Sequence, residues 1–540
     1  MLGLEAEFAS GEEVIRAILR MEADLLWNGG VGTYVKASDE NDAAVGDSAN
    51  DAVRVSGAEL RVQVVAEGGN LGFTQAGRVE FALHGGRINT DAIDNSAGVD
   101  MSDHEVNLKI ALADAIEGGE LSFGERNQLL AELTPEVTDS VLAHNRRQAR
   151  ALRLDQLRSQ TRLNEFRELM VQLEGEGLLD RHLEGLPERD ALRNRRGTFL
   201  GLTAPELAIL LAHSKLALQR HLLASALPDE PFFESYLRAY FPAVINTRFA
   251  AGVRTHRLRR EIIAVELANA VIDTMGAPFV TRISRDTGRE PALVAGAWAV
   301  AVEVSGAADV FAQLSAEPVL PLAAETRSWY ALEAALEGAT KWIVDTQPAG
   351  AEAAELSRLL TTPTQELLHL LPSVLPMAAH AALTAATEAL AAEGTPRLLT
   401  ERIVALDHLT ELFEIAYIAA DMDVPRATAA EVYYRTGEAV DLNWVRHCLQ
   451  LLPAEDRWER RAIEGLAESL AAARRRLAQS ILRQHPRDIG AGLQAYGQAQ
   501  HDQLTRLNAL ISDLKNTPRP TLAALVVVMR EVGRLADRDE

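Results

Sequence analysis

The segment from Ala66 to Lys109, AEGGNLGFTQAGRVEFALHGGRINTDAIDNSAGVDMSDHEVNLK, constrains the fold of this chain more than any other. It holds two loops, Glu67 to Gly72 and Asp94 to Val99, in which glycines surround an asparagine and a carboxylate. Glycine allows a backbone to approach a ligand closely, and asparagine offers both donors and an acceptor. The run Val62 to Ala66 before the first loop predicts a short buried strand. Ligands of open α/β sheets bind at the carboxyl ends of such strands, so the segment predicts half of a nucleotide-binding site.

Two other strand-like segments end in similar loops. They run from Ala23 to Trp27 and from Arg87 to Ile93. Strands that alternate with glycine loops are typical of the later strands of a parallel sheet. We therefore expect an α/β region over residues 1–120, forming the C-terminal part of a Rossmann-like nucleotide-binding domain.

Beyond residue 120 the chain changes to long stretches of Ala, Leu, Arg and Glu, which are good helix formers. From Leu258 to Met275, apolar residues recur on one helical face. Gly276 is expected to cap this helix and Pro278 to prevent its continuation. The sequence thus predicts α/β followed by mainly α, with a large helical domain over residues 121–540.

Composition excludes several classes of protein. The formal net charge of -23 argues against a sequence-independent nucleic-acid binder, since phosphate binding needs clustered Lys and Arg. No signal-peptide pattern opens the chain and no uninterrupted apolar span suits a bilayer, which favours a cytoplasmic protein without a membrane partner. The single cysteine, Cys448, excludes an internal disulfide framework and is expected to be a small buried apolar side chain.

The motifs resemble those of one enzyme family. AEGGN and NSAGVDMSDHE are similar to the AEGAN and NAGGVxxSxxE motifs of glutamate dehydrogenases. The wider text resembles the large bacterial NAD-specific glutamate dehydrogenases, most strongly in the N-terminal part and more loosely in the helical remainder. The segments that carry this resemblance are LLWNGGVGTYVKAS, GDSANDAVRV, DNSAGVDMSDHEVNLKI, LTAPELAILLAHSKL and HRLRREIIAVELANAVIDTMG.

This resemblance implies an activity and a cofactor site. The activity is the NAD-dependent oxidative deamination of L-glutamate to 2-oxoglutarate and ammonia, and the residues alone do not distinguish NAD from NADP. Asn70, with the backbone at Gly69, would contact the ribose and nicotinamide side of NAD. Asn95 would contact the nicotinamide carboxamide, and Gly98 would allow close approach. The alternative is that both asparagines only bond their own backbone in turns. Ala97 replaces a glycine of the family motif, which leaves the local backbone conformation open.

Ser102 has two interpretations. By resemblance it matches the serine that helps to hold the substrate's side-chain carboxylate. The pattern Ser102-Asp-His-Glu105 is also a capping box, which would place Ser102 at the start of a helix. Both roles can hold together, because a helix N-terminus also favours a bound carboxylate.

Other polar clusters carry no assigned chemistry. Asp100, Asp103 and His104 are expected to be helix caps and solvated charges, because a metal site would need further ligands. We therefore predict no metal. The cluster from Asp47 to Asp51 resembles a family motif without an assigned role and is expected to form a loop held by side-chain turns.

The sequence lacks two features of a complete dehydrogenase. No G-x-G-x-x-G motif follows a strand, and no segment resembles the family's substrate domain with its catalytic lysine and aspartate. We therefore expect the chain to be the C-terminal part of a longer protein, with its catalytic residues upstream and no activity in isolation. As an alternative function, the helical region would be a non-catalytic regulatory or oligomerisation module of a larger dehydrogenase. In either case we expect a homo-oligomer.

Overall fold

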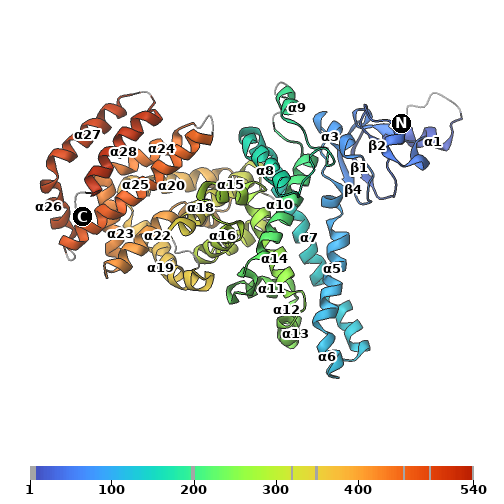
Figure 1. Cartoon of the computed structure of the whole chain (residues 1–540), viewed down its shortest axis with the longest axis horizontal. Helices are drawn as coiled ribbons and strands as arrows, with labels where there is room; N and C mark the ends of the chain where they lie inside the picture. Colours follow the sequence, from blue (N-terminus) through green and yellow to red (C-terminus); the bar gives the residue numbers. More distant parts are fainter. Residues whose placement is uncertain are drawn as a thin grey trace. The chain divides into compact units, whose positions relative to one another are not determined.

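The computed structural model describes residues 8–195, 201–317, 320–346, 351–453, 457–485, 488–517 and 519–537. The chain divides into two compact units, Met1–Gly296 and Ala297–Glu540. Helices dominate both units, and the strands lie in the N-terminal part of the first (Figure 1). The expectation of a mainly helical chain with its few strands near the N-terminus is confirmed.

The described residues contain two small parallel sheets. In the first, β1 (Ala23–Asn28) pairs with β4 (Val62–Glu67), in a register that sets Asn28 beside Glu67. In the second, β2 (Val35–Lys36) pairs with β3 (Val55–Ser56). The strands predicted at residues 23–27 and 62–66 are therefore confirmed, and their carboxyl ends lie side by side.

The strand predicted from Arg87 to Ile93 was wrong beyond its first residue. Only Arg87 pairs with β4, through an isolated parallel bridge to Val64. The chain then enters α4 (Asp91–Asp94), and the Thr90 carbonyl accepts hydrogen bonds from two amides of that helix. Asn and Asp side chains compete for backbone groups and favour turns and helix starts over strand pairing. Asn89 illustrates this, because its side-chain amide donates to Asp94 Oδ1 at 2.9 Å.

A small apolar core holds the sheets against a helix. It is formed by buried side chains of the strands and of α3 (Gln75–Leu83), and includes Val35, Val65, Phe73 and Phe81. Thr74 precedes α3 and its hydroxyl accepts a hydrogen bond from the Gly77 amide at 3.0 Å. This N-cap fixes where the helix begins.

Helices make up most of the first unit. Besides α3 and α4, those described with fewer than ten residues, outside the 3-10 turns, are α1 (Gly11–Leu19), α2 (Asp42–Val45), α6 (Ala113–Glu117), α9 (Arg189–Asn194), α11 (Glu234–Tyr240), α12 (Ala243–Arg248), α13 (Ala250–Arg254) and α15 (Phe279–Thr287). The longer ones are α5 (Ser96–Ala111), α7 (Phe123–Thr161), α8 (Leu163–Gly175), α10 (Ala204–Ala224) and α14 (Arg259–Met275), with α16 (Pro291–Ser305) crossing into the second unit.

Two of these helices have well-defined ends. α7, with 39 residues, begins at a capping box formed by Ser122 and Glu125. α14 confirms the helix predicted from Leu258 to Met275, and Gly276 follows it with a φ of 85°. Glycine adopts this left-handed region without the steric cost that a Cβ would bring.

The second unit is a helical assembly with its own core. Its helices are α17 (Ala307–Ala316), α18 (Leu322–Thr346), α19 (Ala353–Val374), α20 (Met377–Ala392), α21 (Arg397–Leu406), α22 (Leu409–Asp421), α23 (Arg426–Ala439), α24 (Leu442–Leu451), α25 (Arg457–Gln484), α26 (Ile489–Ala499), α27 (His501–Lys515) and α28 (Leu522–Ala536). Leu412, Tyr433, Leu477 and Val528 belong to this core. Cys448 joins them as a buried side chain, as the sequence predicts.

Among the described residues, no single helix combines the length and apolar composition needed to cross a bilayer. Three pairs of consecutive helices reach that composition only together, and each pair is sharply bent at the break between its members.

Gly276→Ala tests the packing behind α14. A Cβ at Gly276 would clash with the side chains of Asp155 and Arg158, which form a buried ion pair. The Asp155 carboxylate also accepts a hydrogen bond from the Ala277 amide at 3.0 Å. Inserting an extra methyl group into a packed buried site costs about 1–3 kcal/mol. Gly288→Ala is the control, because its φ of 69° is also positive but a Cβ there meets no atom within 4 Å. Thermal unfolding should show a much larger drop in Tm for Gly276→Ala, and equal drops would contradict this packing.

Candidate functional site

The candidate site lies where β1 and β4 end. The Asn28 carbonyl accepts hydrogen bonds from the Gly68 and Gly69 amides, at 2.8 and 3.0 Å. The loop after β4 is thereby tied to the end of β1. Parallel strands that end together present their following loops at one edge of the sheet. The loop after β1, which begins at Gly29, meets the first glycine loop, Glu67 to Gly72, in this way.

The glycines of these loops allow them to interlock. A Cβ on Gly69 would collide with the Gly30 carbonyl, and one on Gly72 would collide with the Asn28 side-chain amide. Gly69, predicted to approach the cofactor, thus has a structural reason to be glycine that needs no ligand. Leu71, between these glycines, adopts a φ of 59° that is rare outside glycine.

The fold brings Asn70 and Asn95 together from the two predicted loops. The Asn95 side-chain amide donates to Asn70 Oδ1 at 3.3 Å. Asn70 is exposed and Asn95 is half-buried, at the junction between α4 and α5. The two asparagines that the motifs single out, 25 residues apart in the sequence, are therefore neighbours.

Gly98 and Ser102 lie one turn apart on the exposed side of α5. The Ser102 hydroxyl donates to the Gly98 carbonyl at 3.3 Å. The predicted capping role of Ser102 was wrong, because α5 begins at Ser96 and already includes it. α5 starts before the predicted position because Asn95 both ends α4 and precedes the first residue of α5. Ser102 therefore lies inside the helix, whereas an N-cap residue precedes it in an extended conformation.

The buried ion pair of Glu67 and Arg78 holds both glycine loops in place. Glu67, the last residue of β4, has no exposed surface and accepts two hydrogen bonds from the Arg78 guanidinium, at 2.7 and 3.0 Å. Arg78 also pairs with Asp91 at 3.2 Å, and Asp91 accepts the Leu71 amide at 2.8 Å. The Glu67 amide donates to Asp94 at 3.0 Å. This network, which the sequence motifs did not reveal, joins the first loop to the start of the second.

Burial shapes the electrostatics of this network. It raises the pKa of Glu67, and the neighbouring Arg78 charge offsets only part of that rise. Burial likewise raises the pKa of Asp94, against the hydrogen bond from Asn89. Both carboxyls therefore depend on their partners to remain ionised.

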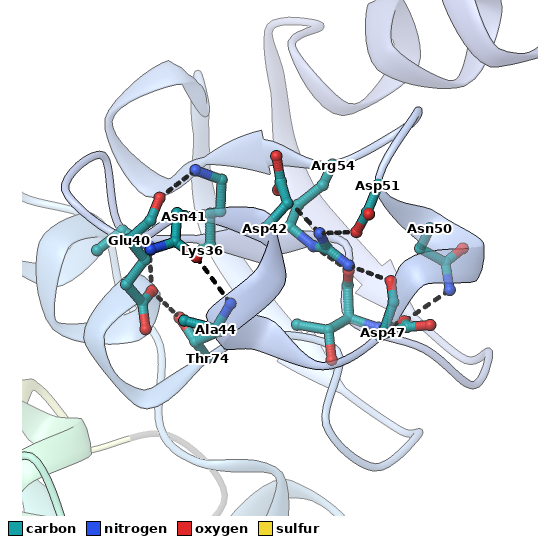
Figure 2. Close-up of polar contacts among 12 residues, drawn as sticks. Lys36, Glu40, Asn41, Asp42, Ala44, Asp47, Asn50, Asp51, Arg54 and Thr74 are labelled. Atoms are coloured by element: carbon teal, nitrogen blue, oxygen red, sulfur yellow. Dashed lines mark hydrogen bonds and ion pairs between the residues drawn. The ribbon is translucent and has the colours of Figure 1, made fainter.

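A second polar cluster braces the loop after β1 (Figure 2). The Arg54 guanidinium donates to Asp42, Asp51 and the Thr33 carbonyl, at 2.8, 2.6 and 2.9 Å. Asp47 accepts the Thr33 amide at 2.7 Å, and this bond is the first cause of its lowered pKa. Thr33 in turn donates its hydroxyl to the Leu71 carbonyl at 2.7 Å. The segment from Asp47 to Asp51, expected to be a loop, contains a short 3-10 helix, Ser48–Asn50. Side-chain bonds hold it as predicted, and through Thr33 it supports the loops after β1 and β4.

α5 begins within the second glycine loop and packs beside α7 (Figure 1). The Asn145 side-chain amide on α7 donates to the Ile93 carbonyl and the Ser96 hydroxyl, at 2.7 and 3.0 Å. One turn further along α5, Asp100 accepts a hydrogen bond from His144 at 2.7 Å. His104 was expected to be a cap or a solvated charge, but it is buried in this helix contact.

Comparison with known proteins identifies the family of this chain. The catalytic-domain family described as "Bacterial NAD-glutamate dehydrogenase, catalytic domain" matches residues 1–155, which hold the strands and both loops. The family described as "Glutamate dehydrogenase, C-terminal" matches residues 200–534. The chain therefore belongs to the bacterial NAD-specific glutamate dehydrogenase family, as the motifs indicate.

Three curated relatives are each named as an NAD-specific glutamate dehydrogenase. The protein from Pseudomonas aeruginosa is 35% identical over 99% of this chain and 33% of its own length. The protein from Halomonas elongata is 33% identical over 99% of this chain and 33% of its own length. The protein from Mycobacterium tuberculosis is 35% identical over 97% of this chain and 32% of its own length. The chain thus spans about a third of the length of these relatives.

Arg78→Met tests the buried ion pair, because it keeps side-chain length but removes the charge that Glu67 needs. Breaking a buried pair costs about 3–5 kcal/mol at neutral pH. The control is Arg20→Met, whose partner Glu59 is largely solvated, and it should cost at most about 1 kcal/mol. Chemical denaturation of both variants measures the difference.

The loss in Arg78→Met should also depend on pH. Without Arg78 the already raised pKa of Glu67 rises further. The ionised carboxylate then destabilises the fold as the pH climbs above the unfolded value of about 4.3. The gap to the wild type should therefore shrink as the pH falls toward that value. A gap that stays constant from neutral to acidic pH would show that Glu67 is not its source.

Proposed function

We propose that this chain forms part of an NAD-dependent glutamate dehydrogenase, which converts L-glutamate to 2-oxoglutarate and ammonia. Family membership and the relatives' names support this activity. Bound NAD supplies the hydride acceptor at its nicotinamide ring. The residues of this chain hold and orient that ring, which raises the rate by fixing the reacting geometry.

The observation that carries the proposal is the pair of Asn70 and Asn95. Their mutual hydrogen bond uses Asn70 Oδ1 and Asn95 Nδ2. This leaves the Asn70 amide as a donor and Asn95 Oδ1 as an acceptor, next to each other at the ends of two loops. The carboxamide of nicotinamide has a carbonyl oxygen that can accept from the Asn70 amide and an NH₂ group that can donate to Asn95 Oδ1. It therefore complements this arrangement. The fit favours cofactor binding over asparagines that serve only their own turns.

Gly98 and Ser102 extend the proposed site along α5. A Cβ at Gly98 would lie 2.9 Å from Asn95 Oδ1, so glycine keeps that acceptor open. Gly69 shapes the first loop and presents Asn70. Ser102 is exposed one turn beyond Gly98, and its hydroxyl is proposed to contact the glutamate side-chain carboxylate.

The fold around this site is proposed to be the later part of a Rossmann-like domain over residues 1–120, in a cytoplasmic enzyme. The parallel pairing of β1 with β4, and the bridge from β4 to Arg87, support this reading. Residues 121–540 are proposed as the helical region, which contributes to both compact units of the chain. Proton transfer at the substrate is assigned to residues outside the set named here.

A second candidate function for the helical domain is regulation or assembly of a homo-oligomer. Met377 and Leu398 are large apolar side chains that are 88% and 79% exposed on α20 and α21. Contiguous exposed apolar surface is typical of subunit contacts, and the two helices that carry these side chains pack against each other. Sedimentation of the chain as a monomer at high concentration would argue against assembly.

Asn95→Ala tests the cofactor role in the intact enzyme. Leaving a polar partner unsatisfied costs about 1–3 kcal/mol, which corresponds to a fall in kcat/KM for NAD of roughly 5- to 150-fold. The control is Asn127→Ala, because Asn127 is exposed on α7 and bonds only its neighbour Arg126 among the described residues. Steady-state kinetics at varied NAD measure both variants. Wild-type kinetics for Asn95→Ala would remove this residue from the site.

Ser102→Ala tests the substrate role. Because the hydroxyl only bonds back to the Gly98 carbonyl, stability should change by no more than about 0.5 kcal/mol. Ser469→Ala is matched, since the Ser469 hydroxyl makes the same exposed bond one turn back, to Gly465. Only Ser102→Ala should lower kcat/KM for glutamate and shift preference toward norvaline. An unchanged glutamate-to-norvaline ratio would reject the substrate contact.

A further inference from the structure

Asp100, His104 and His144 bring three metal-ligating groups together where α5 packs on α7. One ligand atom from each lies within 4.8 Å of the other two. Asp100 and His104 are one turn apart on α5, and His144 comes from α7. The prediction of no metal assumed that no further ligand joins Asp100 and His104, and His144 is such a ligand.

His104 is the most informative member of the cluster. Its side chain is 1% exposed, yet neither ring nitrogen has a hydrogen-bond partner among the described residues. A buried polar group left unsatisfied is costly, and an absent ion is one recognised explanation. The ring also stacks on Tyr240 with centroids 4.1 Å apart, which fixes its orientation. Burial lowers the pKa of His104, which favours the neutral imidazole that a metal ion needs as a ligand.

The Asp100 carboxylate lies near the imidazole rings of both His104 and His144. Asp100 Oδ2 lies 2.7 Å from His144 Nδ1, and Asp100 Oδ1 lies 3.6 Å from His104 Nε2. Burial tends to raise the pKa of Asp100, but the hydrogen bond and charge of His144 lower it overall. Ligands at about 2.0–2.2 Å from a tetrahedral ion lie roughly 3.3–3.6 Å apart. Small side-chain rotations therefore bring the three groups to ligating distances.

We infer that Asp100, His104 and His144 bind one first-row transition-metal ion, with Zn²⁺ as the best fit. Two imidazoles and one carboxylate suit this class of ion, whereas Mg²⁺ and Ca²⁺ prefer oxygen ligands alone. On binding, the ion takes the lone pair of His144 Nδ1, and the proton now at that nitrogen moves to Nε2 or to solvent.

The charges around the cluster are of both signs. The carboxyls of Glu266 and Asp103 interact electrostatically with the cluster, and so does the cation Arg147. A bound ion would fix α5 to α7 next to Asn145, which holds the first turn of α5. The metal would thus be a structural clip below the loop that carries Asn95. This inference does not depend on the proposed dehydrogenase activity.

The test uses the 540-residue chain after dialysis against a chelator. Zn²⁺ is titrated in competition with a chromophoric chelator, and thermal unfolding is followed with and without the ion. We expect one equivalent of Zn²⁺ per chain and a higher Tm. His104→Gln and His144→Gln should each weaken this binding by at least about tenfold.

The control is His213→Gln, because His213 lies beside the carboxylate of Glu184 at 3.5 Å but outside this cluster. It should bind Zn²⁺ as the wild type does. Asp100→Asn keeps the side-chain shape and replaces either histidine variant that does not fold. A wild-type chain that takes up no stoichiometric Zn²⁺ overturns the inference. Uptake that is equal in the wild type and in the cluster variants overturns it as well, because the ion then sits elsewhere.

Discussion

The buried pair of Glu67 and Arg78 is the interaction on which the rest of the candidate site depends. Glu67 ends β4 at the point where the first glycine loop begins, and Arg78 reaches it from α3. Through Asp91 the same guanidinium is linked to the backbone of the first loop, and the Glu67 amide reaches Asp94 in the second. A carboxylate that is fully buried at this position requires a neighbouring cation to remain ionised. The two loops are therefore fixed by one electrostatic requirement.

The remaining supports extend this arrangement outward. Thr33 links the loop after β1 to Leu71, and the cluster around Arg54 holds Thr33 in place. On the other side, Asn145 ties the first turn of α5 to α7. The proposed cofactor residues Asn70 and Gly98 are exposed and Asn95 is half-buried, while the groups that position them are hydrogen-bonded or ion-paired. Such preorganisation is what a site that orients a nicotinamide ring requires.

Sequence predicted those parts of this arrangement that depend on local pattern. The strands at residues 23–27 and 62–66 and the helix ending at Met275 follow from apolar periodicity and glycine stops. The motifs singled out Asn70 and Asn95, which lie together. Pattern failed where side chains compete with the backbone, as at residues 88–93 and at Ser102. It also could not show that His144, 40 residues beyond His104, faces the same space, because that contact depends on tertiary packing.

Hydrogen–deuterium exchange on the intact enzyme, with and without saturating NAD, tests the central claim most directly. The proposal places the nicotinamide between the loop at residues 68–72 and the start of α5. Backbone amides of residues 68–72 and 94–99 should therefore exchange more slowly with NAD bound, while helical peptides beyond residue 297 remain unchanged. Saturable NAD binding that leaves both loops unprotected would contradict the assignment of this strand end as the cofactor site.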